Sequence, residues 1–593
     1  FKNRSTDYVF IGDVYADVNI LEGLDYHFSV GLDKGIGKNK SYNKSGLIRV
    51  STPHQSGLEE YRNDEQTVFL ENRLTYTKSL NKHNFSLMVA HTEQETQSDF
   101  QSAESDGGYD KEPYIWQISA STANVISAGG ESSWALRSYL GRFTYDFDER
   151  YFLTGILRRD GSSNFSEERR WGNFPSLSAG WDISKEGFFN IDLISHLKLR
   201  VGYGEVGSAT EEPYRYQSTV TTNPQQGVSY YFGADEESRY YGSSREADDI
   251  VNRDITWQTL KETNFGIDIE LNEGKFLFTG DYYQGTMEDL LTELPVPGTI
   301  GAPIEVAPFV NAVSMKRNGY EFAITYRDVI GDFRYNISAN GFHLNNEVTE
   351  LPYGVTELGG GSTREGQPVG QNFLLEYKGI YTQSDIDNLP EDFTILGQRP
   401  VVGDAKYADI NGRNENGNLT GEPDNNISED DDRKIIGNPV PYLQYGLNFD
   451  ASYRNYFFSV FFQGVTKRDV YNSYYANLNT AGANTFTADF DPYINGEGTD
   501  PRLVSGESGN NLPSSRFIEN GAYFRLKNLQ IGYNIPLEAF QEFKVFISGQ
   551  NLFTLTEYRG LDPEFEGGIF SRGFDPMTYP NVRTLSAGFN ITF

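Results

Sequence analysis

The chain ends with the stretch Arg583-Thr-Leu-Ser-Ala-Gly-Phe-Asn-Ile-Thr-Phe593, in which apolar and polar residues alternate strictly. Its apolar row contains Leu585, Ala587, Phe589, Ile591 and Phe593, and its polar row contains Thr584, Ser586, Gly588, Asn590 and Thr592. Successive side chains of a β-strand point to opposite faces. A strict period of two therefore predicts a strand with one apolar face and one polar face.

The same alternation recurs in upstream segments. An apolar residue occupies every second position over residues 265–271, 333–339 and 447–453. The positions between them carry polar or charged side chains such as Arg334 and Asp450. Repetition of this two-faced pattern predicts a chain built from many β-strands.

Connections of two kinds join these strands. Short turns occupy residues 148–150, 272–274 and 454–455. The other connections are long and polar, and they cover roughly residues 209–256, 351–370, 381–441, 468–520 and 554–580. Outer-membrane barrels show this asymmetry between periplasmic turns and extracellular loops. The sequence thus predicts an all-β fold, a large antiparallel transmembrane β-barrel with long extracellular loops, and disfavours a soluble sandwich or propeller, which would show regular turns or blade repeats.

The overall composition agrees with an all-β chain. It includes 39 Tyr, 41 Phe and 60 Gly but only 4 Met, and aromatic residues favour strands. The mean hydropathy is −0.54, and no stretch approaches the ~20 continuous apolar residues of a membrane helix. A membrane barrel keeps a low average because lipid-facing residues alternate with lumen-facing ones, so this value does not argue against one.

Charge and residue content exclude several functions. The formal net charge of −33 argues against a basic surface for nucleic acid. The absence of cysteine excludes disulfide scaffolds and thiolate zinc sites. None of the six histidines, at positions 27, 54, 83, 91, 196 and 343, has the spacing of a metalloprotease motif. We therefore predict that the chain is not an enzyme and has no catalytic residues.

One acidic stretch has oxygen-bearing side chains at alternate positions, as calcium loops do. The candidate ligands are Asp409, Asn411 and Asn416, followed by the acidic run 429–432. Arg413 stands where a calcium loop needs an oxygen ligand. The alternative, a solvated acidic loop with Asx turns, is favoured. Calcium is therefore a weak candidate, and we expect no other cofactor or metal.

Several groups of residues have two possible roles. We predict that Tyr456, Phe457, Phe458, Phe461 and Phe462 form a lipid-facing aromatic girdle. The loop tyrosines could stack on sugar rings or pack against a lid protein; they are Tyr230, Tyr231, Tyr240, Tyr241, Tyr474 and Tyr475. The run 359–361 lacks the lysine and context of a phosphate-binding loop, and we interpret it as a flexible external loop. The sequence does not identify substrate-binding residues.

A series of ordered segments extends along nearly the whole chain. It begins with Leu153-Thr-Gly-Ile-Leu-Arg-Arg-Asp-Gly-Ser-Ser-Asn-Phe165 and Arg170-Trp-Gly-Asn-Phe-Pro-Ser-Leu-Ser-Ala-Gly-Trp181. It continues with Leu197-Lys-Leu-Arg-Val-Gly-Tyr-Gly204, Gly403-Asp-Ala-Lys-Tyr-Ala-Asp-Ile-Asn-Gly412, Asp432-Arg433, Ile436-Gly-Asn-Pro439, Tyr523-Phe-Arg-Leu-Lys-Asn-Leu529, Gly549-Gln-Asn-Leu-Phe-Thr554 and Leu561-Asp-Pro-Glu564. The series resembles the SusC/RagA family of TonB-dependent outer-membrane transporters from the Bacteroidetes.

The resemblance implies a cell outer-membrane location and a plugged barrel of 22 strands. It further implies import of glycan or peptide oligomers, a SusD-like surface lipoprotein as lid, and energy from the TonB complex. Our count of roughly 16 to 18 strands between Tyr8 and Phe593 falls short of 22, and we find no plug or TonB-contacting segment. Unpaired sheet edges cost several kcal/mol per backbone group in lipid. We therefore expect residues 1–593 to be a barrel portion whose plug and first strands lie elsewhere.

Competing functions remain open at this point. The leading hypothesis is the wall of a TonB-dependent importer of oligomeric nutrients. The alternative is a structural or docking barrel that scaffolds surface proteins without active transport. The third hypothesis is a soluble glycan-binding or glycan-cleaving β protein. Recovery of the protein in the soluble fraction without detergent would favour this hypothesis.

Overall fold

The computed structural model describes residues 2–592, apart from residues 44–45, 50–51, 55, 108–115, 122–123, 210–212, 218–219, 222–230, 233–239, 242–243, 246–249, 295–307, 353, 481–486, 505–508, 538–539 and 566. The main element is one sheet of 17 strands. This confirms the predicted all-β fold and agrees with the strand count expected from the sequence. No helix within these described ranges has the length and apolar character needed to span a membrane.

The chain divides into two compact units. The first comprises Phe1–Trp181, Val201–Glu262 and Met287–Ala312, and the second comprises Asp182–Arg200, Thr263–Thr286 and Val313–Phe593. Five strands of the sheet contribute residues to both units; they are β9 (Trp171–Asp182), β10 (Ile194–Ser208), β15 (Gln258–Leu271), β16 (Phe276–Glu293) and β17 (Phe309–Ile330).

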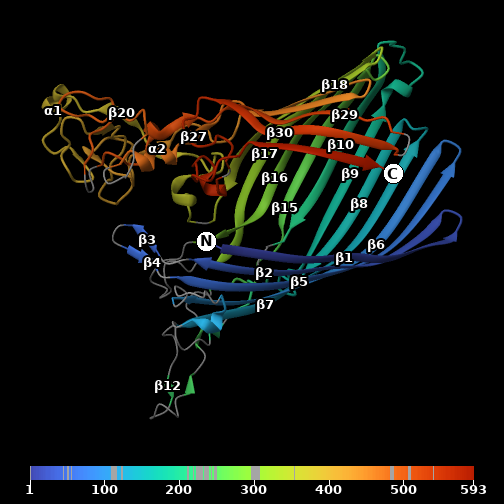
Figure 1. The fold of residues 1–593 in the computed structure, drawn as a ribbon, viewed down its shortest axis with the longest axis horizontal. Coiled ribbons are helices and arrows are strands. Elements are labelled where there is room, and N and C mark those ends of the chain that lie inside the picture. The colour runs from blue at the N-terminus through green and yellow to red at the C-terminus, as the bar shows by residue number, and fades with distance from the viewer. Residues whose placement is uncertain are drawn as a thin grey trace. The chain divides into compact units, whose positions relative to one another are not determined.

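Long antiparallel hairpins form the first unit (Figure 1). Its strands pair in the order β1 (Lys2–Leu21), β2 (Leu24–Asn43), β5 (Gly57–Leu80), β6 (His83–Asp106), β7 (Val125–Phe147), β8 (Tyr151–Ser162) and β9 (Trp171–Asp182). Strands β5 and β6 each have 24 residues, more than twice the ~9 to 11 that cross a bilayer. The small elements of this unit are β3 (Gly46–Arg49), β4 (Thr52–His54), β11 (Val220–Thr221), β12 (Tyr231–Phe232), β13 (Tyr240–Tyr241), β14 (Ser244–Arg245) and the 3-10 helix η1 (Ile118–Ala120).

One face of β7, β8 and β9 carries an apolar band bordered by aromatic side chains. At the turn end of the band, Tyr151 stacks on Trp181 with ring centroids 6.4 Å apart. At the far end, Tyr139 stacks on Trp171 with centroids 6.0 Å apart. Tyr139 pairs with Arg159, eight residues beyond Tyr151, so the two aromatic borders lie about 26 Å apart along the strand at ~3.3 Å per residue. This height matches the lipid-facing band of a membrane barrel.

The second unit adds the rest of the sheet. Its strands pair in the order β17, β18 (Phe333–Glu350), β25 (Gln444–Tyr453), β26 (Tyr456–Val465), β29 (Tyr523–Asn534), β30 (Glu542–Thr556) and β31 (Thr584–Thr592). Its small elements are β19 (Phe373–Leu375), β20 (Tyr377–Ile380), β21 (Thr394–Ile395), β22 (Ala405–Tyr407), β23 (Asn426–Ile427), β24 (Arg433–Ile435), β27 (Asp469–Tyr471), β28 (Ile518–Asn520), α1 (Gln383–Asn388), α2 (Ser473–Leu478), η2 (Ile183–Lys185), η6 (Gly359–Gly361), η7 (Ser515–Phe517) and η8 (Ile569–Ser571).

The register of these strands aligns like residues into two opposite faces. One row across six strands consists of Tyr335, Ala451, Phe458, Ile531, Ile547 and Ala587. The neighbouring row on the other face consists of Asn336, Asp450, Ser459, Gln530, Ser548 and Ser586. We call these the apolar face and the polar face. The period of two read from the sequence thus extends across these six strands of the second unit.

The predicted aromatic girdle of β26 divides between the two faces. Tyr456, Phe458 and Phe462 share the apolar face, as predicted. Phe457 and Phe461 lie on the polar face, where the ring of Phe457 is 5.8 Å from the ammonium group of a lysine in β30. The prediction was wrong for these two residues because consecutive strand residues must point to opposite sides.

The short turns occur where they were predicted, at residues 148–150, 272–275 and 454–455. Asp148 and Glu149 both adopt a φ of 53°, and Lys82 donates to the Asp148 carboxylate at 2.8 Å. Left-handed backbone at two successive residues suits the twist of a tight hairpin. Polar residues at these positions therefore fix the register of the strands that they join.

One expectation about the connections turns out differently. From the sequence we expected two connections here, over residues 351–370 and 381–441. The structure instead has a single connection over residues 351–443, between β18 and β25. Its strands β19 and β20 pair with β24 and β22 rather than with the main sheet. Strand β31 pairs with β30, whereas Phe593 lies outside the described residues. The expectation that the second neighbour of β31 lies outside this sequence stays a prediction.

Candidate functional site

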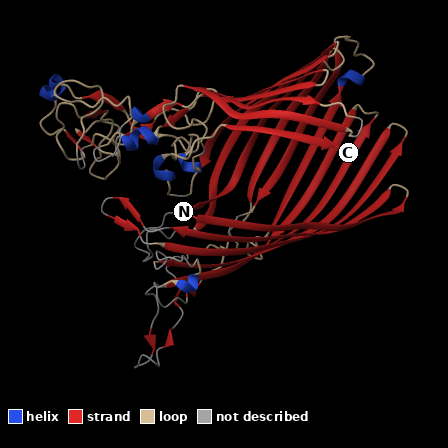
Figure 2. Cartoon of the chain, viewed as in Figure 1, coloured by secondary structure: helices blue, strands red, loops and turns tan. Residues whose placement is uncertain are grey.

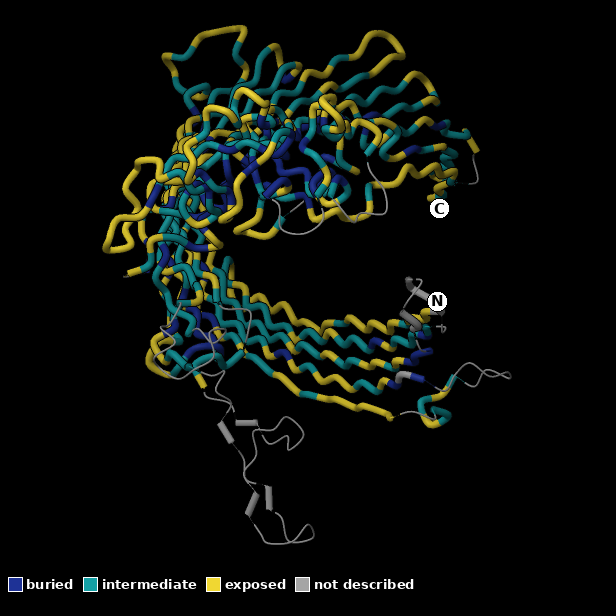
Figure 3. Tube along the Cα trace, turned by 90° about the vertical axis from the view of Figure 1, so that its left-hand side faces the viewer, coloured by how far each residue is buried: buried dark blue, intermediate teal, exposed yellow. Residues whose placement is uncertain are grey.

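Three long connections of the second unit fold together into one body, which we call the loop assembly. They cover residues 351–443, 466–522 and 557–583 and contain both α-helices of the chain's described part (Figure 2). Buried residues gather in the loop assembly, whereas the strands of the second unit are mostly intermediate or exposed (Figure 3). Loops normally lack a core of their own, so this burial marks the assembly as a folded element.

The first hydrophobic core of the assembly lies in connection 351–443. Its members are Leu375, Tyr381, Phe393, Ile395, Ala405, Tyr407 and Ile427. Helix α1 covers part of this core, and it begins with a capping box between Thr382 and Asp385. Leu512 of the second connection packs against the same core. Hydrophobic burial therefore ties the first two connections together.

A second core joins all three connections. Leu374 comes from the first connection, and Tyr471, Tyr475 and Phe517 come from the second. Phe574 of the third connection stacks on Tyr471 with ring centroids 4.5 Å apart. The three connections are consequently one packed body.

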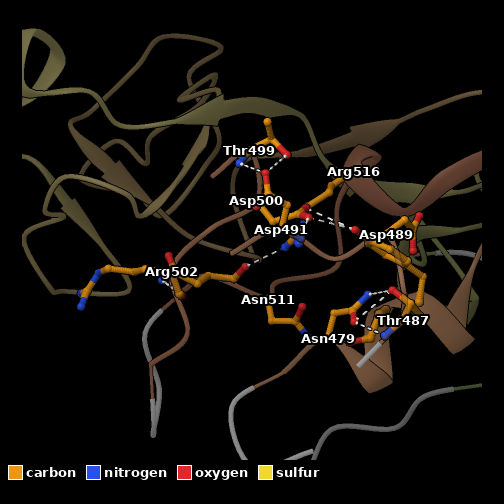
Figure 4. A network of polar contacts seen from close by, with 12 residues as sticks. Asn479, Thr487, Asp489, Asp491, Thr499, Asp500, Arg502, Asn511 and Arg516 are labelled. Atoms are coloured by element: carbon orange, nitrogen blue, oxygen red, sulfur yellow. Dashed lines mark hydrogen bonds and ion pairs between the residues drawn. The ribbon is translucent and has the colours of Figure 1, made fainter. Parts of the chain in front are cut away.

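Ion pairs with at least one buried partner reinforce these cores. Arg502 Nε donates to the buried Asp404 Oδ1 at 2.6 Å, and Arg516 Nη2 donates to Asp500 Oδ1 at 2.8 Å (Figure 4). The Tyr475 hydroxyl also donates to Asp500, at 3.2 Å, and burial raises the pKa of Tyr475. A buried charge is costly unless it is paired, so these contacts fix the chain path around residues 500–516.

A pocket of about 700 Å³ lies where the loop assembly meets the polar face. Phe342 lines it from the middle of β18, and Gln444 and Gln463 line it from the ends of β25 and β26. The register places these side chains on the polar face. Residues of all three connections complete the lining, including Arg468 and Glu564. Both the sheet and the loop assembly thus line this open pocket.

Charged side chains of β29 hold the third connection beside this pocket. Arg525, whose side chain is 3% exposed, donates to Glu564 Oε2 at 2.6 Å and to Asp562 Oδ1 at 2.5 Å. Burial opposes ionisation of Asp562, but the bond from Arg525 prevails and its pKa is lowered. The register of β29 shifts between Leu526 and Asn528, and this bulge lets Lys527 reach Glu564 as well, at 2.9 Å.

The predicted calcium ligands bind the protein's own backbone. Asp409 accepts from the amides of residues 424 and 425, and Asn411 Oδ1 accepts from the Gly421 amide at 2.6 Å. The backbone amide of Asn416 donates to the Asn414 Oδ1 atom at 3.0 Å. Among the described residues, no group of three or more His, Cys, Asp or Glu side chains is placed to hold a metal. These bonds are the Asx contacts of the alternative interpretation, and the calcium site stays a prediction.

The predicted loop tyrosines are not equivalent. Tyr475 is 4% exposed, and the Arg559 guanidinium lies 4.4 Å from the centre of its ring. It is therefore a core residue and cannot stack on a sugar. Tyr474 is half-buried on the same helix. Tyr230 lies outside the described residues, and for Tyr231, Tyr240 and Tyr241 only the strand pairing of β12 with β13 is described.

The remaining sequence candidates have structural roles. His83 bonds to Tyr145 at 2.9 Å and His196 to Asp182 at 3.2 Å, each within the sheet or its turns. The run 359–361 forms η6, where Gly361 is buried against Phe373. It is therefore an ordered part of the loop assembly and not the flexible loop that we expected, because the three positive φ values that glycine permits allow a tight turn.

Sequence reasoning missed the charged cluster around Arg525. Its members come from two of the segments that carry the family resemblance, Tyr523–Leu529 and Leu561–Glu564. The first segment carries Arg525 and Lys527, and the second carries Asp562 and Glu564. The opposite charges of the two segments could have predicted that they lie in contact. No local sequence pattern indicated a role for Arg468, because its guanidinium contacts backbone carbonyls and the ring of Phe565, all distant in sequence.

Comparison with known proteins gives a consistent result. The family model described as TonB dependent receptor-like, β-barrel, matches residues 3–552. TonB-dependent receptor P3 of Formosa agariphila is 29% identical over 98% of this chain and 57% of its own length. TonB-dependent receptor SusC of Bacteroides thetaiotaomicron is 27% identical over 100% of this chain and 56% of its own length. The chain thus spans about half the length of these curated relatives.

A solved structure shares the fold over the whole chain. The RagAB peptide transporter matches with a TM-score of 0.79 and 22% identity, over 100% of this chain and 62% of the other. The same assembly in its "open-open" state matches equally well, with a TM-score of 0.79 and 21% identity. At this identity the likeness establishes the fold.

Proposed function

Since the chain belongs to the family of TonB dependent receptor-like β-barrels, we propose that it forms the wall of a transporter that imports oligomeric nutrients. Proteins of this family reside in the outer membrane, as this chain does, and they are receptors and transporters rather than enzymes. The proposal assigns the plug and the TonB contact to polypeptide outside this sequence. Glycan and peptide oligomers are the proposed substrates.

The pocket between the polar face and the loop assembly carries this proposal. Its sheet side belongs to the face opposite the apolar one, so it opens toward the lumen rather than toward lipid. Its amide side chains Gln444 and Gln463 provide hydrogen-bond donors and acceptors for a polar oligomer. A few polar groups in a concave, partly apolar site are typical of ligand recognition.

We propose further that the loop assembly supports a SusD-like surface lipoprotein as a lid. Transport then depends on a difference in substrate affinity between open and closed states of the lid. The folded character of the loop assembly favours this role, because a rigid surface loses less conformational entropy on binding than mobile loops do. Copurification of the whole gene product with the neighbouring surface lipoprotein tests this part of the proposal.

The decisive test is uptake by intact cells. We expect cells with the full-length gene to accumulate labelled oligosaccharide or oligopeptide, and cells lacking either the gene or TonB to lose this uptake. Surface binding of the same probes in cells without TonB should persist. Unchanged uptake without TonB would refute active import.

A docking barrel without transport is the second candidate. The loop assembly favours it too, since a surface with its own cores suits protein docking as well as substrate capture. The uptake experiment separates the two functions. A docking barrel would bind surface proteins, and its deletion would leave the uptake of every probe unchanged.

A further inference from the structure

Two arginine residues that line the pocket have no carboxylate partner among the described residues. Arg468 and Arg572 both contribute to its lining. Arg468 is 7% exposed, and its guanidinium donates to the carbonyl oxygens of Pro439 at 3.1 Å, Arg572 at 3.1 Å and Phe565 at 3.4 Å. Within the part of the chain that the structure describes, neither arginine forms an ion pair.

The acidic groups around the pocket are already engaged. Glu564 accepts from Arg525 at 2.6 Å, and Asp575 accepts from the Tyr558 hydroxyl at 2.6 Å. Burial is the largest influence on the pKa of Arg468 and lowers it. The charged residues of the lining are Arg468, Arg572 and Glu564, so the pocket has an excess of positive charge in a chain whose formal net charge is −33.

The two arginines have different capacities to bind a ligand. Arg468 donates hydrogen bonds from its Nε, Nη1 and Nη2 atoms to backbone carbonyl oxygens. Arg468 thus supplies buried charge and little free donor capacity. The backbone of Arg572 lies at the end of η8, and its guanidinium donates no hydrogen bond to any residue that the structure describes. A free guanidinium can grip a carboxylate through two parallel N–H bonds.

We propose that this pocket binds a carboxylate group of the imported oligomer, with Arg572 as the direct donor and Arg468 as supporting charge. The inference rests on the proposed import function and specifies its substrate class. Gln444, Gln463 and Phe342 would contact the uncharged part of the oligomer. A uronate and an acidic amino acid present the same carboxylate chemistry, and the experiment distinguishes these sources.

The test measures binding to the full-length protein purified in detergent. One pair of probes is hexagalacturonate and its methyl ester. The other is a capped glutamate-containing hexapeptide and its glutamine analogue. We expect at least one carboxylated probe to bind about tenfold more tightly than its neutral partner. Preference within the first pair identifies uronate-containing glycans, and preference within the second identifies acidic peptides.

Three variants make the test specific to the pocket. Arg572→Gln should abolish the preference for the carboxylated probe. Arg572→Lys should keep part of this preference, because lysine has the positive charge but lacks the two parallel N–H donors of a guanidinium. Arg399→Gln is the matched control, since Arg399 is an exposed arginine of the same connection as α1 and bonds only to backbone carbonyls. It should leave the preference unchanged.

Equal affinity for both members of each pair would overturn the proposal, and so would an unchanged preference in Arg572→Gln. Uptake by intact cells separates this failure from failure of the proposed function. If cells import charged and neutral probes equally and in a TonB-dependent way, this result supports the proposed import function and refutes the carboxylate site.

Discussion

Arg516 and Asp500 form an ion pair inside the loop assembly, with 2.8 Å between Nη2 and Oδ1 and side chains that are 7% and 15% exposed. The rings of Tyr377 and Tyr475 lie 5.9 and 6.0 Å from the guanidinium. Tyr377 belongs to the first connection and the other three residues to the second. The pair therefore stabilises the contact between two connections, not only one loop.

Replacing Arg516 by methionine should destabilise the loop assembly by about 3 kcal/mol, because Asp500 would remain buried without its partner. Adding Asp500→Asn should recover part of this loss. Pulse proteolysis in urea, applied to the protein in outer-membrane vesicles, measures the effect. Arg413→Gln is the control, since its pair with Asp431 leaves Arg413 47% exposed and should contribute less than about 1 kcal/mol. Equal losses in the two variants would contradict the assigned role.

The helix α1 should loosen in acid. The Lys406 ammonium, with help from Thr382, lowers the pKa of Asp385 from 3.8 to about 2. A carboxyl whose pKa is lower in the folded state stabilises that state above its unfolded pKa, and it loses this contribution as pH falls from about 4 to 2. Hydrogen exchange of the α1 amides should therefore accelerate over this window. In Asp385→Asn the exchange should be fast at every pH, whereas Asp387→Asn should keep the acid transition.

Strand alternation was readable from the sequence because it depends on local geometry alone. Residues 333–339 and 447–453 carry the period of two, and each became one strand of the predicted kind. The aromatic run of β26 was misassigned at Phe457 and Phe461, where we applied residue type without the same alternation. The register supplies the correction, since Phe457 pairs with Ser452 on the polar face.

The loop assembly was not readable, because contacts distant in sequence create it. Leu374, Phe517 and Phe574 come from three connections and meet in one core. No local pattern predicts such a meeting, and polar composition suggested open loops instead. Tyr475 shows the consequence: a tyrosine in a long loop looked like a ligand contact and is a core residue.

Calcium should have no effect on the acidic stretch around Asp409. Its Oδ2 atom accepts from the Asn425 amide at 2.8 Å, and burial raises its pKa. We expect Asp409→Asn to destabilise the loop assembly by about 1 to 2 kcal/mol, since one amide loses its acceptor. The loss should be the same in calcium and in chelator, as measured by pulse proteolysis. A protective effect of calcium that disappears in Asp409→Asn would establish the calcium site instead.

Lysine substitutions at two adjacent positions of β30 test which face of the sheet contacts lipid. Ile547 belongs to the apolar row and is 62% exposed, whereas Ser548 belongs to the polar row. Ile547→Lys should destabilise the folded protein by about 2 to 4 kcal/mol, because its charge would enter the hydrocarbon layer near mid-depth. Ser548→Lys should cost much less, since its ammonium group would reach the aqueous lumen.

Both variants add the same side chain to the same strand, so β-propensity and net charge are matched. Urea titration of the refolded full-length protein in lipid vesicles gives the two free energies of unfolding. A larger loss in Ser548→Lys would reverse the assignment of the faces, and would place the pocket of Gln444 and Gln463 on the lipid side.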